Sequence, residues 1–502
     1  MKKSVSLLLA LLMVLSCVVS MVACNKKDKT PVSSGSGEGQ LSDTDEWGRP
    51  VIESPLDPTL YYEGKTVTVL SRNDWESVGQ FVPSELDSDV INSAVLKRNE
   101  MVLSRLGVTI ENMPVNGGNF NAELNQLIRT QVHSGACEFD MIANFAYYGS
   151  ALAMEGYYYD LKKLSHLHTD QIWWNQDYIR QSVIGDRMYM AVNDSCLRAL
   201  RYTMVTFFNK GLVQDWLNGV NLYDAVNNNE WTLDYFNRLI KDVYEDKNAS
   251  GIAEADDLFG MITSTSSQNI DAWFSGLGLR TCTIGNDGIP VLSLENDLTI
   301  SCFEQVRNLF FNNTGVFVNG TATTDYVDAR KAFAENHSLF STGQLDNGGV
   351  FVSEMQGDFG VLPMPKIDAE DPYTTTPQDA YDFLAIPSCI FDKSQAEMIG
   401  AVMEYMAYAS YMTTKPSYFE TITKLRYSND VADANMFDLI SEHVYFDFGM
   451  IYSSSIVGIG TNLGHFWRNL FQTGATNFSS EYSKSSSAYE KQLENVIEML
   501  TT

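Results

Sequence analysis

Residues 65–143 alternate between short apolar runs and longer stretches with helical spacing, and this order constrains the fold more than any other feature. The runs at residues 65–70, 108–110 and 139–143 are rich in β-branched and apolar side chains, which predicts three buried strands. A helix is predicted from about Ser88 with Gly107 as its C-terminal cap, and a second helix ends near Gly135. Strand–helix–strand order at this spacing predicts a parallel sheet covered by helices.

A second α/β unit follows after Arg198. Residues 202–208 predict a buried strand, and Thr232 is the expected N-cap of an amphipathic helix that begins at Leu233. Residues 358–366 and 383–387 predict two further short strands, residues 396–410 a helix, and the region after Ser479 a terminal helix. Because 502 residues exceed one ordinary hydrophobic core, the sequence predicts an α/β protein with two lobes.

Aromatic and polar side chains follow two of the predicted strands. In parallel sheets, ligands bind outside the carboxyl ends of the strands. Trp75 follows the first strand, and Asn144, Tyr147 and Tyr148 follow the third. Sugar rings bind to flat aromatic faces, amides and carboxylates, so these four residues are candidate ligand contacts. Packing in the core is the competing interpretation for Trp75.

The first 23 residues have the parts and order of a secretory signal: two lysines, an apolar run and the small residue Ala23. Cys24 follows directly, which predicts a lipoprotein signal with lipidation at Cys24, although Met21 stands where leucine is usual. An ordinary cleaved signal and an uncleaved anchor helix are the alternatives. Residues 24–60 are predicted to form a flexible tether between the membrane and the folded body.

The net charge of −29 argues against nucleic acid and anionic lipid headgroups as partners. Membrane contact is therefore expected only through the N-terminal lipid. Five cysteines follow Cys24 and are predicted to be mostly buried thiols; Cys282 and Cys302 form a candidate pair that no spacing pattern supports. No CxxC or HExxH spacing occurs, so neither a metal site nor a cofactor is predicted.

Several short segments occur in an order that resembles a known family. Besides the lipoprotein signal, they are residues 66–69, 140–142, 159–161, 173–174, 185–189, 207–210, 231–234, 331–333, 339–340 and 360–366. Over residues 62–470 the chain is similar to the extracellular solute-binding proteins of ABC sugar importers, the family that includes maltose-binding protein.

The resemblance implies a two-lobed, periplasmic-binding-protein-like fold of type II with a hinge. Lobe 1 would comprise residues 61–198 and 383–414, and lobe 2 residues 199–382 and 415–502. The resemblance also implies that the lobes close over a sugar or oligosaccharide on the extracytoplasmic side of the membrane. A monomer without enzymatic activity would then deliver this carbohydrate ligand to ABC permease subunits.

Further candidate contacts depend on this resemblance. Asn193, Asp194 and Tyr202 lie at the first expected crossover between the lobes, Trp273 begins an aromatic helix in lobe 2, and Trp467 lies where relatives present a ligand-facing tryptophan. Residues 341–346 lack the aromatic side chain that related proteins often carry, so a maltose-type site does not transfer directly. Three other tryptophans are interpreted as structural anchors: Trp173, Trp174 and Trp231.

Two alternative functions stay open from the sequence. A surface-anchored glycoside-acting enzyme is one, because 63 acidic residues provide many carboxylate pairs, although no GxSxG motif occurs. A ligand-sensing subunit of a membrane signalling system is the other. No catalytic residue is predicted.

Overall fold

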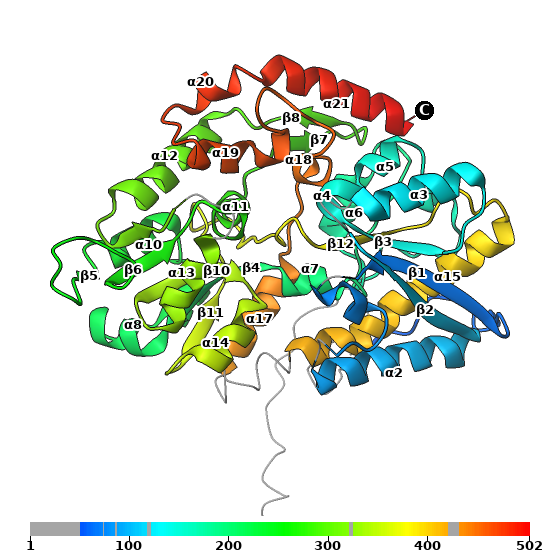
Figure 1. Cartoon of the computed structure of the whole chain (residues 1–502), viewed down its shortest axis with the longest axis horizontal. Helices are drawn as coiled ribbons and strands as arrows, with labels where there is room; N and C mark the ends of the chain where they lie inside the picture. Colours follow the sequence, from blue (N-terminus) through cyan, green and yellow to red (C-terminus); the bar gives the residue numbers. More distant parts are fainter. Residues whose placement is uncertain are drawn as a thin grey trace, which may run out of the picture. The chain divides into compact units, whose positions relative to one another are not determined.

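The first sheet of the molecule has the strand order β12-β3-β1-β2 (Figure 1). The structure, a computed structural model, describes residues 51–501 apart from 74, 86–87, 118–121, 321–324 and 420–430. Strand β1 pairs in parallel with β2 and β3, as predicted, whereas β12 runs antiparallel to β3. The strands are β1 Lys65–Arg72, β2 Val108–Val115, β3 Met141–Phe145 and β12 Asp382–Ala385.

Short and long helices connect these strands. They are η1 Trp75–Gln80, α2 Asp89–Leu106, α3 Ala122–Ser134, α4 Ala146–Gly149, α5 Ala151–Met154, η3 Leu161–Lys163, α6 Gln176–Ser182 and α15 Lys393–Met412. Helix α2 has the predicted ends: the Ser88 side chain accepts a hydrogen bond from the Ile91 N–H, and Gly107 adopts a left-handed conformation with φ of 69°.

Packed structure begins earlier in the chain than the sequence indicated. Leu56 is buried with 4% of its surface exposed, inside the range predicted as tether. The Arg105 side chain of α2 donates to the Leu60 carbonyl oxygen at 2.9 Å, which attaches this segment to the first sheet's outer helix. Residues 1–23, Cys24 and the start of the predicted tether lie outside the described residues.

A second sheet has the strand order β11-β4-β10-β6-β5, and β9 also pairs with β6. Its strands are β4 Met204–Asn209, β5 Tyr244–Glu245, β6 Leu258–Thr263, β9 Val316–Val318, β10 Ser338–Gln344 and β11 Phe359–Leu362. Its helices are α7 Leu197–Arg201, α8 Lys210–Trp216, α9 Leu222–Asn227, α10 Leu233–Ile240, α11 Ser267–Gly276, α12 Asp297–Asn312, α13 Asp325–Ala334, α14 Asn347–Glu354 and α17 Val431–Glu442.

Helix α10 begins where the sequence predicts, whereas β4 begins two residues later than predicted. Thr232 caps α10 as predicted, because its side chain accepts a hydrogen bond from the Tyr235 N–H. The strand predicted to begin at Tyr202 begins instead at Met204, because the Tyr202 N–H bonds to the Arg198 carbonyl oxygen and ends α7.

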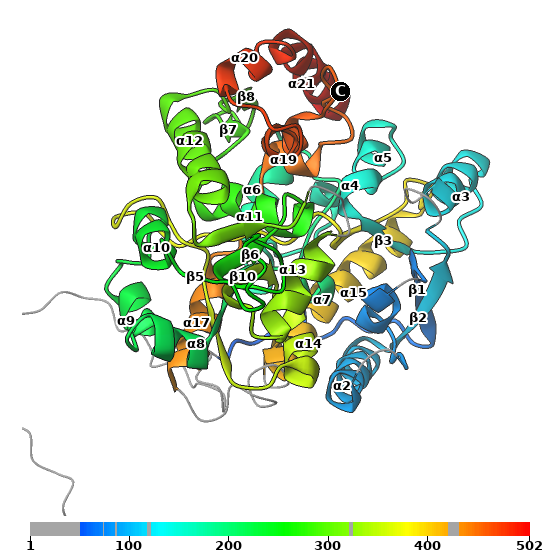
Figure 2. The same ribbon diagram turned by 60° about the vertical axis from the view of Figure 1, so that its left-hand side comes forward.

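The C-terminal segment contacts helices from around both sheets (Figures 1 and 2). It comprises α18 Phe448–Ile451, η4 Leu463–His465, α19 Phe466–Gln472, α20 Phe478–Tyr482 and α21 Ser486–Thr501, beside the hairpin of β7 Cys282–Ile284 and β8 Pro290–Leu292. Helix α19 packs on α11, whereas α18 contacts α6 and α21 contacts α5. This segment therefore links the elements of the two sheets.

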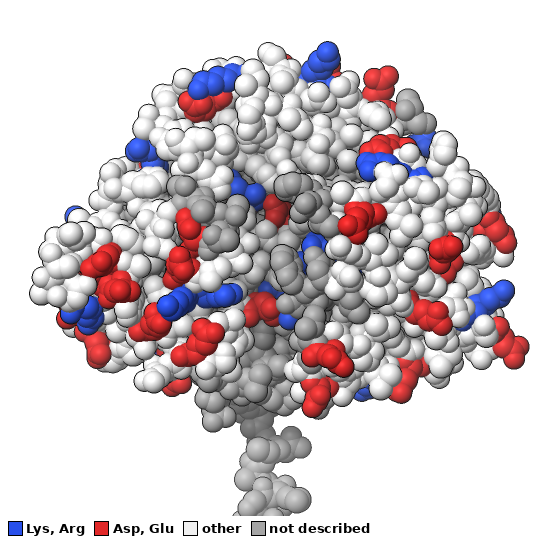
Figure 3. Space-filling model, in the orientation of Figure 1, with Lys and Arg blue, Asp and Glu red and all other residues white. Residues whose placement is uncertain are grey.

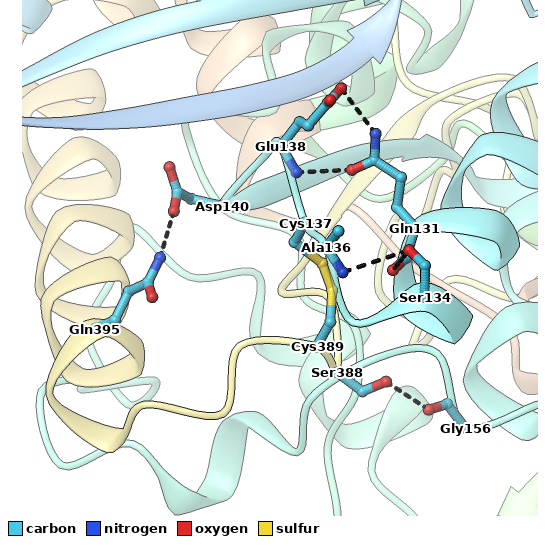
Figure 4. The surroundings of a disulfide bond; sticks show 10 residues. All are labelled: Gln131, Ser134, Ala136, Cys137, Glu138, Asp140, Gly156, Ser388, Cys389 and Gln395. Atoms are coloured by element: carbon cyan, nitrogen blue, oxygen red, sulfur yellow. Dashed lines mark hydrogen bonds between the residues drawn. A yellow bond between two sulfur atoms is a disulfide. The ribbon is translucent and has the colours of Figure 1, made fainter.

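A disulfide joins two distant parts of the chain around the first sheet (Figure 4). Cys137 precedes β3 and Cys389 follows β12, with Cα atoms 6.2 Å apart and a sequence separation of 252. Cys282 and Cys302, the candidate pair from sequence, are both free and buried. The reason is topological: β12 returns to pair with β3, which brings the residues flanking these two strands together.

Trp173 and Trp174 have a structural role, as the sequence suggested. Both indole N–H groups donate to the buried carboxylate of Glu404 in α15, at 2.7 and 2.9 Å, and the His168 N–H donates to it at 2.9 Å. Burial raises the pKa of Glu404 to about 7 although these donors act in the opposite direction. The carboxylate thus holds residues 168–174 against α15.

The raised pKa of Glu404 predicts a stability that depends on pH. Because the folded-state pKa exceeds the unfolded value, the contribution of Glu404 is fully present below about pH 4.5 and is lost as the pH rises through 7. This pH-dependent contribution of Glu404 to the free energy of unfolding is about 3 kcal/mol. Glu404→Gln does not titrate and places an amide N–H against one indole N–H, so it should be about 1–3 kcal/mol less stable than wild type at pH 4.5. Because wild type loses most of that ~3 kcal/mol between pH 4.5 and 7.5, urea unfolding should show the gap between the two proteins closing or reversing; a constant gap would contradict the prediction.

Candidate functional site

The loops after β1 and β3 and the segment before β12 meet at one edge of the first sheet. Phe145, the last residue of β3, pairs with Asp382, the first residue of β12, and the Ala146 N–H donates to the Tyr381 carbonyl oxygen at 2.9 Å. The guanidinium of Arg72, at the end of β1, lies 4.5 Å from the centre of the Phe145 ring. This is the edge where a parallel sheet presents ligand contacts.

Three aromatic side chains stand together at this edge. The rings of Tyr147 and Tyr148 are 4.3 Å apart and nearly perpendicular, at 72°, and Tyr148 also contacts Phe145 at 5.3 Å. All three side chains are only half-buried. They lie there because β3 ends at Phe145 and α4 begins directly afterwards, so that successive residues project around its first turn.

The C-terminal segment supplies the opposite side of this aromatic group. The imidazole of His465 stacks on Tyr147, with ring centres 4.6 Å apart at 22°, and the Asn462 side-chain N–H donates to the Tyr147 hydroxyl oxygen at 3.1 Å. The Asn462 side chain also accepts from the His465 N–H and so caps η4, which fixes both residues in this position. Tyr147 thus joins α4 to the C-terminal segment.

A charged network adjoins these rings. His465 Nε2 lies 3.0 Å from Asp379 Oδ2, and Arg468 Nη2 donates to the same oxygen at 2.9 Å. Arg468 also forms a salt bridge with Asp271 of α11, with Nε 3.0 Å from Oδ1. One guanidinium therefore connects α19, α11 and the segment that leads into β12.

The two carboxylates of this network have opposite pKa shifts. Burial by itself raises the pKa of Asp379, but Arg468 and the hydrogen bond from His465 outweigh burial and hold that pKa well below its ordinary value. For Asp271, burial dominates and raises the pKa despite Arg468. Burial also raises the pKa of Tyr148 to about 12, so its hydroxyl stays protonated at neutral pH.

The structure brings together only part of the residue set predicted from sequence. Tyr147 and Tyr148 belong to the group described above. Trp75 begins η1, and its side chain lies outside the described residues. Asn144 is buried and donates to Asn125 at 3.0 Å and to the Tyr158 hydroxyl at 2.8 Å, which stabilises the turn between β3 and α4.

The three residues predicted at the first crossover make internal contacts. Asn193 is buried, and its side-chain oxygen accepts from the Ser195 N–H at 2.9 Å. Asp194 forms an ion pair with Lys415 at 3.1 Å. The Tyr202 ring lies under the Arg198 guanidinium at 4.7 Å, and Arg198 donates to its hydroxyl at 3.2 Å. Two of these contacts are local, and the Asp194–Lys415 ion pair joins this segment to the residues after α15.

Trp273 and Trp467, both expected to face a ligand, lie in an aromatic core. Trp273 is fully buried and packs against Phe236 and Phe310, at 5.7 and 6.0 Å. Trp467 is 2% exposed, and its ring contacts those of Phe274 and Phe471 at 5.6 and 5.3 Å. Their faces are occupied by protein because α19 packs directly on α11.

Sequence reasoning missed the polar half of the site. Asp379, His465, Arg468, Asn462 and Asp271 were not singled out. The run His465–Arg468 was the one local signal for these polar residues. In α19, Trp467 points into the core, and its neighbour Arg468 points toward Asp379. Asp379 precedes β12 by three residues, and only the pairing of β12 with β3 places it beside Tyr147.

Other features of the described residues lie apart from this site. A cavity of about 900 Å³ opens at the amino end of β1, the opposite edge of the first sheet, and is lined by residues that include Lys65, Asp140 and Lys393. In the part of the chain that the structure describes, no group of histidine, cysteine or acidic side chains is arranged to hold a metal ion. None of the helices described there is long and apolar enough to span a bilayer.

No protein-family profile and no curated protein sequence matches this chain. Solved structures do match over most of its length. A cyclo/maltodextrin-binding protein complexed with maltotetraose is similar over 86% of this chain and 98% of its own, with a TM-score of 0.55 and 11% identity. The GacH receptor of Streptomyces glaucescens, solved unliganded and with acarbose, is similar over 86% of this chain and 98% of its own (TM-score 0.52, 12% identity).

A third match has a different ligand. UgpB from Mycobacterium tuberculosis, in complex with glycerophosphocholine, is similar over 87% of this chain and 99% of its own, with a TM-score of 0.51 and 13% identity. Together with the two sheets described above, these matches show that the chain has the two-lobed, periplasmic-binding-protein-like α/β fold of solute-binding proteins, as the sequence predicted.

Proposed function

We propose that this protein is an extracytoplasmic receptor that captures a sugar or oligosaccharide and delivers it to an ABC importer. The observation that carries the proposal is the group of half-buried tyrosines beside a carboxylate–guanidinium network, at the carboxyl edge of the first sheet. Aromatic faces pack against the C–H faces of sugar rings, and the polar network can bond their hydroxyls. Proteins of this fold were solved with maltotetraose and with acarbose.

The lobe boundaries at residues 198, 382 and 414 are part of this proposal. Contacts between residues of the two proposed lobes would break when the lobes open. One is the Asn462–Tyr147 hydrogen bond, and another is the ion pair of Arg280 with Asp177 of α6, at 3.3 Å. Closure over a ligand would restore them and present the liganded form to permease subunits.

Lipidation at Cys24 and the tether remain part of the proposed function. The Cys137–Cys389 disulfide supports an extracytoplasmic location, because structural disulfides persist in oxidising compartments. Mass spectrometry of the mature N-terminus tests the anchor: a lipid-modified Cys24 is expected, and an unmodified N-terminus elsewhere would contradict it.

A glycan panel with a thermal-shift readout tests the function itself. Stabilisation that saturates, without a change in the glycan, is expected of a receptor. The carboxylates Asp271 and Asp379 have opposite pKa shifts, as in glycoside-acting enzymes. Both, however, are bound to Arg468, and Asp271 is 5% exposed, so neither is placed to donate a proton to a substrate. Release of a cleaved glycan would show that the protein is a glycoside-acting enzyme and would overturn the receptor proposal.

Tyr148 provides a direct test of the site. Replacing Tyr148 by alanine removes one aromatic face and should weaken binding of the glycan found in the panel by about tenfold or more, with little change in melting temperature. Tyr235→Ala is the matched control, since Tyr235 is also half-buried but lies in α10 against Trp231. Isothermal titration calorimetry measures both; equal affinities in the two variants would place the site elsewhere.

A further inference from the structure

The charges around the candidate site are satisfied by one another. Asp271 and Asp379 share the guanidinium of Arg468, and the Arg72 guanidinium is engaged over the Phe145 ring. Arg72 and Arg468 are two cations and Asp271 and Asp379 are two carboxylates, so the formal charges of these four groups cancel. A ligand that enters such a site finds neither an excess cation for an anionic group nor an excess carboxylate for a cationic one.

The hydrogen bonds of Arg468 determine which ligand groups can bind beside it. Its Nε and Nη2 atoms donate to the two carboxylates, whereas Nη1 makes no hydrogen bond to the part of the chain that the structure describes. One face of a largely buried guanidinium can therefore donate to a ligand. A hydroxyl or ring oxygen accepts this bond without disturbing either carboxylate.

An anionic group at the same place would meet two costs. It would lie close to Asp379, a carboxylate that Arg468 and His465 keep ionised. It would also compete for the guanidinium on which both oxygens of the buried Asp271 depend. A buried carboxylate that loses its partner is strongly unfavourable. Transfer of the Arg468 guanidinium from Asp271 to an anionic ligand group is therefore costly.

The surroundings of the site also disfavour an anionic ligand. The Tyr148 hydroxyl stays protonated at neutral pH, so the aromatic contacts are neutral hydrogen-bonding groups. The whole chain carries a net charge of −29, and the face in Figure 3 shows basic side chains scattered among acidic ones without a broad basic patch. Long-range electrostatics therefore do not attract an anionic ligand.

We propose that the site selects uncharged polyhydroxylated ligands and rejects their carboxylated and phosphorylated counterparts, with the Asp379–Arg468–Asp271 network as the specificity determinant. This inference rests on the proposed sugar-binding function and narrows its ligand class. The half-buried ring of Tyr148, which Tyr147 and its stacked partner His465 support, supplies affinity for the sugar ring, and the paired charges supply the discrimination.

Matched ligand pairs test the proposal by calorimetry on the full mature protein: galactobiose with digalacturonic acid, xylobiose with an aldobiouronic acid, and glucose with glucose 6-phosphate. Wherever a neutral member binds, its anionic counterpart should bind at least about 100-fold more weakly. An anionic member that binds equally or more tightly would overturn the charge selection while leaving the sugar receptor intact. If no member of these pairs and no glycan of the panel binds, both the proposed function and this inference fail.

Asp379→Asn separates the network from general charge effects. It removes one carboxylate, so the ratio of neutral to anionic affinity should fall at least about tenfold, with circular dichroism confirming the fold. Glu155→Gln, which removes an exposed carboxylate paired with Arg129, changes the net charge equally and should leave the ratio unchanged. An unchanged ratio in Asp379→Asn, or an equal fall in Glu155→Gln, would contradict the assignment to Asp379.

Discussion

Replacing Cys137 and Cys389 by serine is expected to lower the free energy of unfolding by about 5 kcal/mol. The disulfide closes a loop with a sequence separation of 252, and the loss of chain entropy in the unfolded state grows with the logarithm of loop length. The cross-link also holds β12 beside β3, although the intervening chain builds the second sheet. Urea unfolding of the double variant and of wild type measures the difference.

A reductant provides the matched comparison. Wild type with dithiothreitol should unfold at the same urea concentration as the double variant, and the double variant should not respond to dithiothreitol. Among the described residues, the other cysteines are free and buried, so they give the reductant no further bond to break. Identical unfolding of reduced and oxidised wild type would show that the cross-link does not contribute to stability.

The second large effect is expected at the buried ion pair between α7 and β12. Arg198 and Asp382 are almost fully buried and 3.7 Å apart, and Asp382 also accepts hydrogen bonds from Ser77 and Gln80 at 3.0 and 2.7 Å. Arg198→Met would leave the Asp382 carboxylate buried without its cation. We expect a loss of about 3–5 kcal/mol, because an uncompensated buried charge is costly.

An exposed ion pair serves as the control for this prediction. Arg129 and Glu155 form a bidentate pair with about a third of each side chain exposed, so Arg129→Met should cost less than about 1 kcal/mol. Denaturant unfolding at pH 7 compares the two variants. A loss of stability in Arg198→Met no larger than that in Arg129→Met would show that the buried Asp382 side chain does not depend on Arg198.

The local elements of the fold could be predicted from the sequence because their signals are local. Ser88 and Gly107 mark the two ends of α2, and Thr232 marks the start of α10, each through hydrogen bonds or backbone angles within a few residues. The parallel orientation of β1, β2 and β3 follows in the same way from their alternation with helices.

The candidate site could be predicted only in part, for a related reason. Tyr147 and Tyr148 directly follow a recognisable strand, so their place at the sheet edge was predictable. Trp273 and Trp467 were expected at the ligand from the resemblance to the solute-binding family, but whether a tryptophan faces a ligand or a core depends on what packs against it.

The sequence by itself thus determined the two α/β units, the caps of their helices and the aromatic residues after β3. Only the tertiary structure decided which polar groups join those rings, since Asp379, Arg468 and Asp271 come from three separate segments. It likewise selected Cys137 and Cys389 as the disulfide partners rather than Cys282 and Cys302. The physical reason is the same in both cases: β12 pairs with β3 across more than 230 residues, and no local pattern encodes which distant side chains that pairing brings together.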